Sequence, residues 1–140
     1  MTELTEELKN ITEPVEFEQW LLNSLEDILF VKKILKIKID KSNPENIKES
    51  ATEAEGWYGR MTEMLADANK YLDMAENDNI VPKSKEVTDY DRTIKLAYSV
   101  AIQRSIRDKV EGLVNGIQQR ISLCQSLISY EKQFVYGNKG

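Results

Sequence analysis

Five lysines within residues 32–41 are the side chains whose type and spacing best suit a chemical task. They are Lys32, Lys33, Lys36, Lys38 and Lys41. A lysine ammonium group binds phosphate oxygens as a point charge, so such a cluster favours salt-sensitive binding to a polyanion. Three aromatic side chains are candidates for stacking on single-stranded bases: Phe30, Trp57 and Tyr58. The alternative is structural, because cations are favourable at the C-terminal end of a helix and a run of charge is often a solvated face.

A second basic set lies in the C-terminal third of the chain, at Arg92, Lys95, Arg104, Arg107, Lys109 and Arg120. Arg104 and Arg107 are three residues apart, which places them about one helical turn from each other. They are candidates to extend a surface for nucleic acid or for a protein partner. The alternative is that they pair with acids on a neighbouring helix, for which the candidates are Glu63, Asp67 and Asp73.

Residue types that serve catalysis are scarce. The chain has no histidine, which is the commonest general base and metal ligand, and its single cysteine, Cys124, makes a structural zinc site untenable. Two acidic pairs, Asp73 with Glu76 and Asp108 with Glu111, have the spacing that all-helical nucleotide pyrophosphatases use to bind magnesium. Charged pairs at this spacing are also common in any acidic helix. We therefore expect no enzyme, no bound metal and no cofactor.

Charge is divided into alternating blocks along the chain. Residues 1–27 carry eight acids and one base, and residues 28–48 carry two acids and six bases. Residues 49–91 carry eleven acids and four bases, and residues 92–140 carry three acids and eight bases. The net charge of −5 conceals this segregation. The blocks can pair within the fold or between subunits, or they can leave a basic surface free for a polyanion.

The lysine cluster ends an amphipathic segment that predicts a helix over residues 15–38. Thr12 and Pro14 mark its start, since proline is tolerated in a first helical turn. Apolar residues then recur at helical spacing: Phe17, Trp20, Leu21, Leu25, Ile28, Val31 and Leu35. Residues 35–40 alternate with period two, which is a strand signal, but no partner strand is evident and a helix end or an extended linker is favoured. Residues 1–14 are predicted to be an acidic arm.

A second helix is predicted over residues 44–76, with Asn43 as its N-cap and Pro44 as its first residue. Its apolar seam has alternating steps of four and three residues, which is a heptad repeat. The seam comprises Ile47, Ala51, Ala54, Tyr58, Met61, Leu65, Ala68, Leu72 and Ala75. A neighbouring row, Trp57, Met64 and Tyr71, widens the apolar face enough for two neighbours. Gly56 and Gly59 are expected where another backbone passes closely.

A third and very long helix is predicted over residues 88–136, capped by Thr88 or Asp89. Its apolar stripe begins with Ile94, Tyr98, Ile102, Ile106 and Val110 and continues to the end of the helix. At the usual rise this helix is about 70 Å long, so it needs partners along its length. The polar residues 77–85 form the connection before it, and residues 137–140 form a tail. A break at Gly112–Gly116 into a helical hairpin is the alternative.

The expected fold is therefore all-α: an elongated three-helix bundle with a single domain over residues 15–136. The third helix exceeds its partners in length, so its uncovered apolar surface predicts a homo-oligomer formed by helix–helix packing. The candidate contact residues are Val110, Leu113, Ile117, Ile121, Cys124, Leu127, Ile128 and Phe134. No run of about 18 apolar residues occurs, and the acidic first residues are unlike a secretory signal. A cytoplasmic location is expected, in the host cell if a phage encodes the chain.

The C-terminal end carries a further pattern. Ile117-x-x-Arg120 is followed by Cys124 and Leu127, and then by Phe134-x-x-Gly137. This order resembles the tails of the UvsY-like recombination mediators of T4-type phages, with one extra residue before Phe134 and with Ile121 where glycine often stands. The resemblance implies an oligomeric ring that binds single-stranded DNA and helps to load a recombinase onto strands covered by single-strand-binding protein. The tail positions would then serve assembly.

Taken with the lysine cluster, this resemblance favours a non-enzymatic, phage-like helical oligomer that binds single-stranded DNA as a recombination mediator or accessory protein. The acidic net charge argues against this reading, since nucleic-acid binders are usually basic. The alternative is a protein-binding adaptor, a virion component or an inhibitor of a host defence system. The acidic blocks 1–27 and 49–91 suit a basic protein partner.

Overall fold

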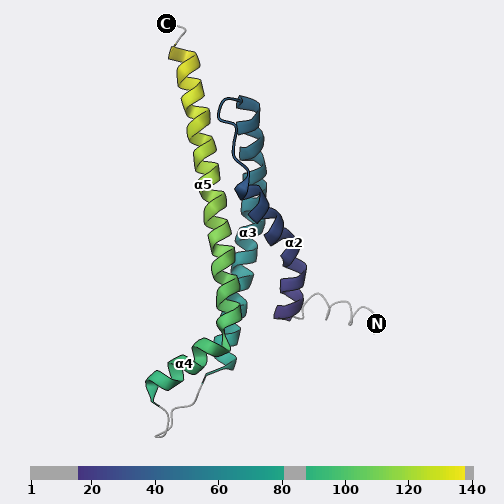
Figure 1. Ribbon diagram of the computed structural model, residues 1–140, viewed down its shortest axis with the longest axis vertical. Coiled ribbons are helices and arrows are strands. Elements are labelled where there is room, and N and C mark those ends of the chain that lie inside the picture. Colours follow the sequence, from purple (N-terminus) through teal and green to yellow (C-terminus); the bar gives the residue numbers. More distant parts are fainter. Residues whose placement is uncertain (1–15, 81–87, 138–140) are drawn as a thin grey trace, which may run out of the picture.

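The computed structural model describes residues 16–80 and 88–137, with side chains as far as Gln133. The predicted arm 1–14, most of the polar connection before the third helix, and residues 138–140 lie outside the described residues. Within the described residues the chain is all-helical, without strands, and has four helices: α2 (Phe17–Lys36), α3 (Pro44–Asp78), α4 (Asp89–Ser99) and α5 (Ala101–Gly137). Figure 1 shows α3 and α5 side by side, α2 packed across them, and the end of α5 projecting past the start of α3.

Helix α3 begins and packs as its sequence predicts. The Asn43 side chain caps it by accepting hydrogen bonds from the backbone N–H groups of Glu45 at 3.1 Å and Asn46 at 3.4 Å. Every residue of its heptad seam is buried or half-buried, and so are Trp57, Met64 and Tyr71 in the neighbouring row. The wide apolar face therefore serves two neighbours, α5 and α2.

Helices α3 and α5 form an antiparallel pair that contains most of the core. At one end Ile47 and Ala51 pack with Cys124, and at the other end Leu72 and Ala75 pack with Val100. The main cluster lies between these ends and includes the fully buried Met61 and Val110. The alanines of the α3 seam let the two backbones approach closely, because they add little side-chain volume at the contact.

Helix α2 is held on this pair by aromatic rings at its start and an ion pair near its middle. Phe17 and Trp20 pack on Tyr71 of α3 with ring centroids 5.6 and 5.2 Å away. Further along, Arg60 Nε donates a 2.6 Å hydrogen bond to Asp27. The helix ends at Lys36, and Ile37 is extended, so the alternating residues 37–40 form a linker rather than a strand.

The predicted helix 88–136 is divided at Val100, so the three-helix count is replaced by four described helices. Ser99 Oγ donates to the Lys95 carbonyl at 2.9 Å, a side-chain bond that bends helices. Val100 is fully buried with Leu72 and Ala75, whereas the predicted stripe residues Tyr98 and Ile102 are 81% and 66% exposed. The bend turns Val100 toward Leu72 and Ala75 at the end of α3 and leaves Tyr98 and Ile102 facing outward. Figure 1 shows α4 turning away from the α5 axis at this point.

Helix α5 continues through Gly112 and Gly116, so the hairpin alternative at these glycines is not what forms. Four glycines in the interior of α3 and α5 differ in the space around them. Among the described residues, a Cβ added at Gly56, Gly59 or Gly112 meets nothing within 4 Å. No described backbone therefore passes closely at Gly56 or Gly59, contrary to expectation. A Cβ at Gly116 would lie 2.8 Å from Leu35 Cδ1. Gly116 therefore lets the end of α2 approach α5.

We expect Gly59→Ala to raise the free energy of unfolding by up to about 1 kcal/mol, because alanine favours a helix and the site has room. Gly116→Ala gains the same helical preference but forces Leu35 to move, which costs about 1 kcal/mol or more. Urea denaturation of both variants measures the difference. Equal stabilisation by the two substitutions would show that Leu35 does not need the space above Gly116.

Among the described residues, no helix combines the length and the apolar character needed to cross a membrane.

Candidate nucleic-acid interface

The C-terminal end of α2, the linker that follows it and the middle of α5 line a shallow groove of about 520 Å³. Its lining brings together Lys36, Lys38 and Lys41 with Gln119 and Arg120 of α5. We call this surface the basic groove. Three of the five predicted lysines thus face one concavity with an arginine from a distant part of the sequence, which is an arrangement suited to several phosphates of one strand.

The lysines are free to bind. All five are exposed, and none forms an ion pair with a residue that the structure describes. The acid among them, Asp40, is occupied locally: it accepts hydrogen bonds from the Ser42 hydroxyl at 2.6 Å and the Ser42 N–H at 3.0 Å. These hydrogen bonds, from the hydroxyl first, lower the pKa of Asp40. The lysine charge is therefore not neutralised by a direct partner among the described residues.

Arg120 belongs to the second basic set named from sequence, but the sequence does not group it with the lysines or select it as a site residue. Its Nη1 donates a 2.8 Å hydrogen bond to the Ile37 carbonyl, which fixes the linker after α2, while its Nε is buried without a hydrogen-bond partner in the described structure. The sequence feature that could have linked Arg120 to the lysines is Gly116, which lies one helical turn before it. The absence of a side chain there admits Leu35 and so brings the end of α2 to Arg120.

Lys32 and Lys33 lie outside the basic groove. Lys32 lines a different, apolar groove between α2 and α5. Lys33 lies one helical turn after Phe30, a residue that is 47% exposed and whose ring packs on Trp57 with centroids 5.2 Å apart. The structure therefore joins Phe30 and Trp57 as an aromatic pair near the lysines. Tyr58 is half-buried against the main core cluster.

Arg104 and Arg107 are not part of this surface. Arg104 pairs at 3.4 Å with Glu76 of α3, a different acid from the three candidates named by sequence. Arg107 pairs with Asp108 at 2.7 Å and Glu111 at 4.0 Å on its own helix. The structural alternative, an ion pair with an acid on a neighbouring helix, thus describes Arg104, whereas Arg107 pairs within its own helix. These ion pairs involve Glu76 of the first acidic pair and both Asp108 and Glu111 of the second. Within the described residues, no group of three or more potential ligands is placed to hold a metal.

The predicted oligomerisation residues lie mostly inside a single chain. Val110, Ile117 and Cys124 are buried against the rest of the bundle. The half-buried members of the set pack on the same core clusters: Leu113, Ile121, Leu127 and Ile128. The side chain of Phe134 lies outside the described residues. A contact between copies through α5 would therefore have to use the positions that the intrachain core leaves exposed.

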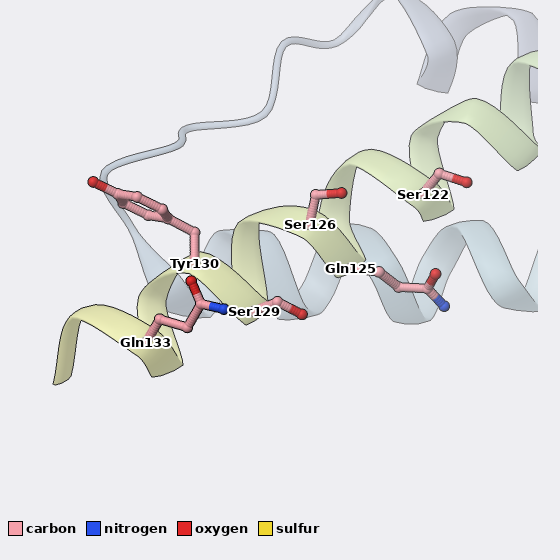
Figure 2. Close-up of a pocket in the computed structure, with 6 residues that line it drawn as sticks. All are labelled: Ser122, Gln125, Ser126, Ser129, Tyr130 and Gln133. Carbon is pink, nitrogen blue, oxygen red and sulfur yellow. The ribbon is translucent and has the colours of Figure 1, made fainter. Parts of the chain in front are cut away.

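The outer face of α5 near its C-terminal end is polar but uncharged. Figure 2 shows six of its side chains, all from this one helix: Ser122, Gln125, Ser126, Ser129, Tyr130 and Gln133. All six are exposed, and they border a shallow hollow without a charged residue. Because a single helix supplies them, they form a surface strip rather than a binding cavity.

Cys124 is a core residue. It is fully buried beside Ile47 and Ala51. Burial raises the pKa of its thiol, and this effect outweighs the lowering by the nearby Arg120 charge. A buried, protonated thiol is a poor nucleophile.

No family model, curated protein or solved structure matches this chain.

Proposed function

We propose that this protein is a non-enzymatic helical oligomer that binds single-stranded DNA through the basic groove, as a recombination mediator or accessory protein. The observation that carries the proposal is the contrast between its cations. Arg60, Arg92, Arg104 and Arg107 all pair with carboxylates, whereas the five lysines of residues 32–41 are exposed and form no ion pair within the described part of the chain.

A single strand suits this surface better than a duplex. The groove is short and shallow, and α2 carries an exposed aromatic residue, Phe30, packed on Trp57, about two helical turns before Lys36 of the groove. Single strands offer unstacked bases for such rings, whereas base faces in a duplex are covered. Phosphates would contact the lysines and Arg120, and a base would stack on Phe30. Binding of this kind is sensitive to salt and tolerant of sequence.

The direct test is the fluorescence anisotropy of labelled oligo-dT titrated with the full-length protein across a salt series. We expect binding at about 50 mM salt that weakens steeply as salt rises. An absence of binding at this low salt would overturn the proposal.

Self-association belongs to the same proposal, and two observations support it. The end of α5 projects past the start of α3 (Figure 1). Its uncharged outer strip also fits a protein contact, because charged residues are depleted at interface centres. The likeness of the C-terminal end to UvsY-like mediators, whose tails serve assembly, points to the same region.

Light scattering at several concentrations tests this part. We expect a mass that is a multiple of the 16.2 kDa chain, and replacing Ser126 and Ser129 with glutamate should lower it, because charge is costly in a packed interface. Lys48→Glu combined with Lys70→Glu, on exposed positions of α3, is a control. A monodisperse monomer at every concentration would contradict self-association.

A second function is favoured by a different surface. Eight of the nine acidic residues of α3 are exposed, against three basic residues on the same helix. This acidic face suits a basic protein partner, as in an adaptor. Failure to bind oligo-dT combined with salt-sensitive binding to a cationic protein would favour this function over the first.

A further inference from the structure

Helix α2 carries a row of exposed side chains on the face opposite its buried residues. The row follows steps of four, three, four and three residues, which places its members on one helical face. We call these residues the outer row: Glu18, Leu22, Leu25, Leu29 and Lys32. The buried residues of α2 are Trp20, Ser24, Val31 and Ile34. The outer row therefore has the spacing of a helix–helix contact, but it faces away from the bundle.

The three leucines of the outer row are 66%, 44% and 57% exposed in chain order. Two of them, Leu25 and Leu29, also line an apolar groove of about 360 Å³ between α2 and α5, whose other wall includes Ile106 and Leu113. The apolar surface thus continues from the outer row toward α5. A continuous apolar surface of this kind is stabilised by a covering partner.

The outer row is complementary to a second copy of itself. It begins with an acid, Glu18, and ends with a base, Lys32, and neither forms an ion pair with a residue that the structure describes. When two outer rows pack antiparallel about a twofold axis at Leu25, each Glu18 lies opposite Lys32 of the other copy. Leu22 then lies opposite Leu29 of the other copy. An interface between identical patches requires such self-complementarity.

We propose that a second copy of this chain covers the outer row, with the two α2 helices antiparallel and Leu25 at the twofold axis. A parallel pair would instead place the two Glu18 side chains, and the two Lys32 side chains, opposite each other. This contact is separate from the one proposed at the end of α5, and it does not depend on DNA binding. No residue of the outer row lines the basic groove.

The test is disulfide formation between full-length chains, with oxidised glutathione as oxidant. Leu25→Cys should give a covalent dimer at least tenfold faster than Leu22→Cys or Leu29→Cys, because residue 25 meets its own copy at the axis. Residues 22 and 29 lie about 9–12 Å along the helix from their own copies in this register. That separation is too long for a disulfide. A mixture of Leu22→Cys and Leu29→Cys chains should nevertheless crosslink to each other.

The unaltered protein is the control for this experiment, since its one thiol, Cys124, is fully buried. Chance collisions would favour the most exposed position, Leu22, over Leu25. The absence of a covalent dimer with Leu25→Cys, or equal rates at the three leucine positions, would overturn the proposal.

A charge exchange gives an independent measurement on the Leu25→Cys crosslink. Glu18→Lys alone, or Lys32→Glu alone, places like charges opposite each other and should slow the reaction several-fold. The two substitutions together restore opposite charges and should restore the rate. A rate that ignores the single substitutions, or that the double substitution fails to recover, would overturn the antiparallel register.

One side chain opposes the proposed contact. Glu26 is exposed beside Leu25, so the twofold axis brings it near its own copy, and like charges there weaken association. Glu26→Gln should therefore speed the Leu25→Cys crosslink. An unchanged or slower rate would contradict the position of the axis.

Discussion

Met61→Ala is expected to lower the free energy of unfolding by about 2–5 kcal/mol, which is the range for truncating a buried methionine to alanine. Met61 is 0% exposed and belongs to the main core cluster together with Val110 of α5 and Val31 of α2. All three large helices contribute to the cluster that this side chain joins. The cavity left by its removal would therefore weaken packing throughout the bundle.

The same helix supplies a matched control, because Met74 is 41% exposed and lies outside the three core clusters. Met74→Ala should change the unfolding free energy by about 0.5 kcal/mol or less. Both substitutions exchange the same two residue types in a helix, so their intrinsic helical preferences cancel. Chemical denaturation followed by circular dichroism measures the difference, and similar losses for the two variants would contradict the position of the core.

Reversing the charge of the basic groove is expected to have the largest effect on binding. The triple substitution Lys36→Glu, Lys38→Glu and Lys41→Glu should weaken binding to oligo-dT by at least about tenfold at low salt. The slope of log affinity against log salt should also flatten by about 2, since each lost phosphate contact on a single strand contributes about 0.7. Anisotropy titrations at several salt concentrations give both quantities.

A second triple separates local contact from overall charge. Lys48→Glu, Lys70→Glu and Lys132→Glu change three exposed lysines outside the basic groove, so the net charge of the protein changes equally. This control should shift affinity slightly and leave the salt slope close to that of the unaltered protein. If the two triples weakened binding alike, the basic groove would not be the binding surface.

The elements of this fold that could be predicted from sequence are those specified by local signals. The heptad seam of α3 and its Asn43–Pro44 start depend on residues within a few turns of one another, and both are found as predicted. The bend at Val100 depends instead on a contact with Leu72 and Ala75. The spacing of Tyr98 and Ile102 is equally compatible with a straight helix, so periodicity alone could not reveal it.

The candidate site likewise combines a feature that local sequence specifies with one that depends on a long-range contact. A dense run of lysines is difficult to bury, so their exposure followed from composition. Arg120 joins them because Gly116 admits Leu35, a contact between residues far apart in the sequence. Periodicity also identified the apolar face of α5 but not what covers it. Val110, Ile117 and Cys124 proved to be covered by the chain itself.

The bend at Val100 also divides the protein into parts of unequal cooperativity. Helix α4 has no buried residue, whereas α5 after the bend is anchored by Val110, Val114 and Ile117. Opening α4 exposes little apolar surface, so it requires much less free energy than opening α5. We therefore expect amide protons of α4 to exchange with solvent through local opening, whereas those of central α5 should exchange only when the whole bundle unfolds. The two parts of one predicted helix thus belong to different cooperative units.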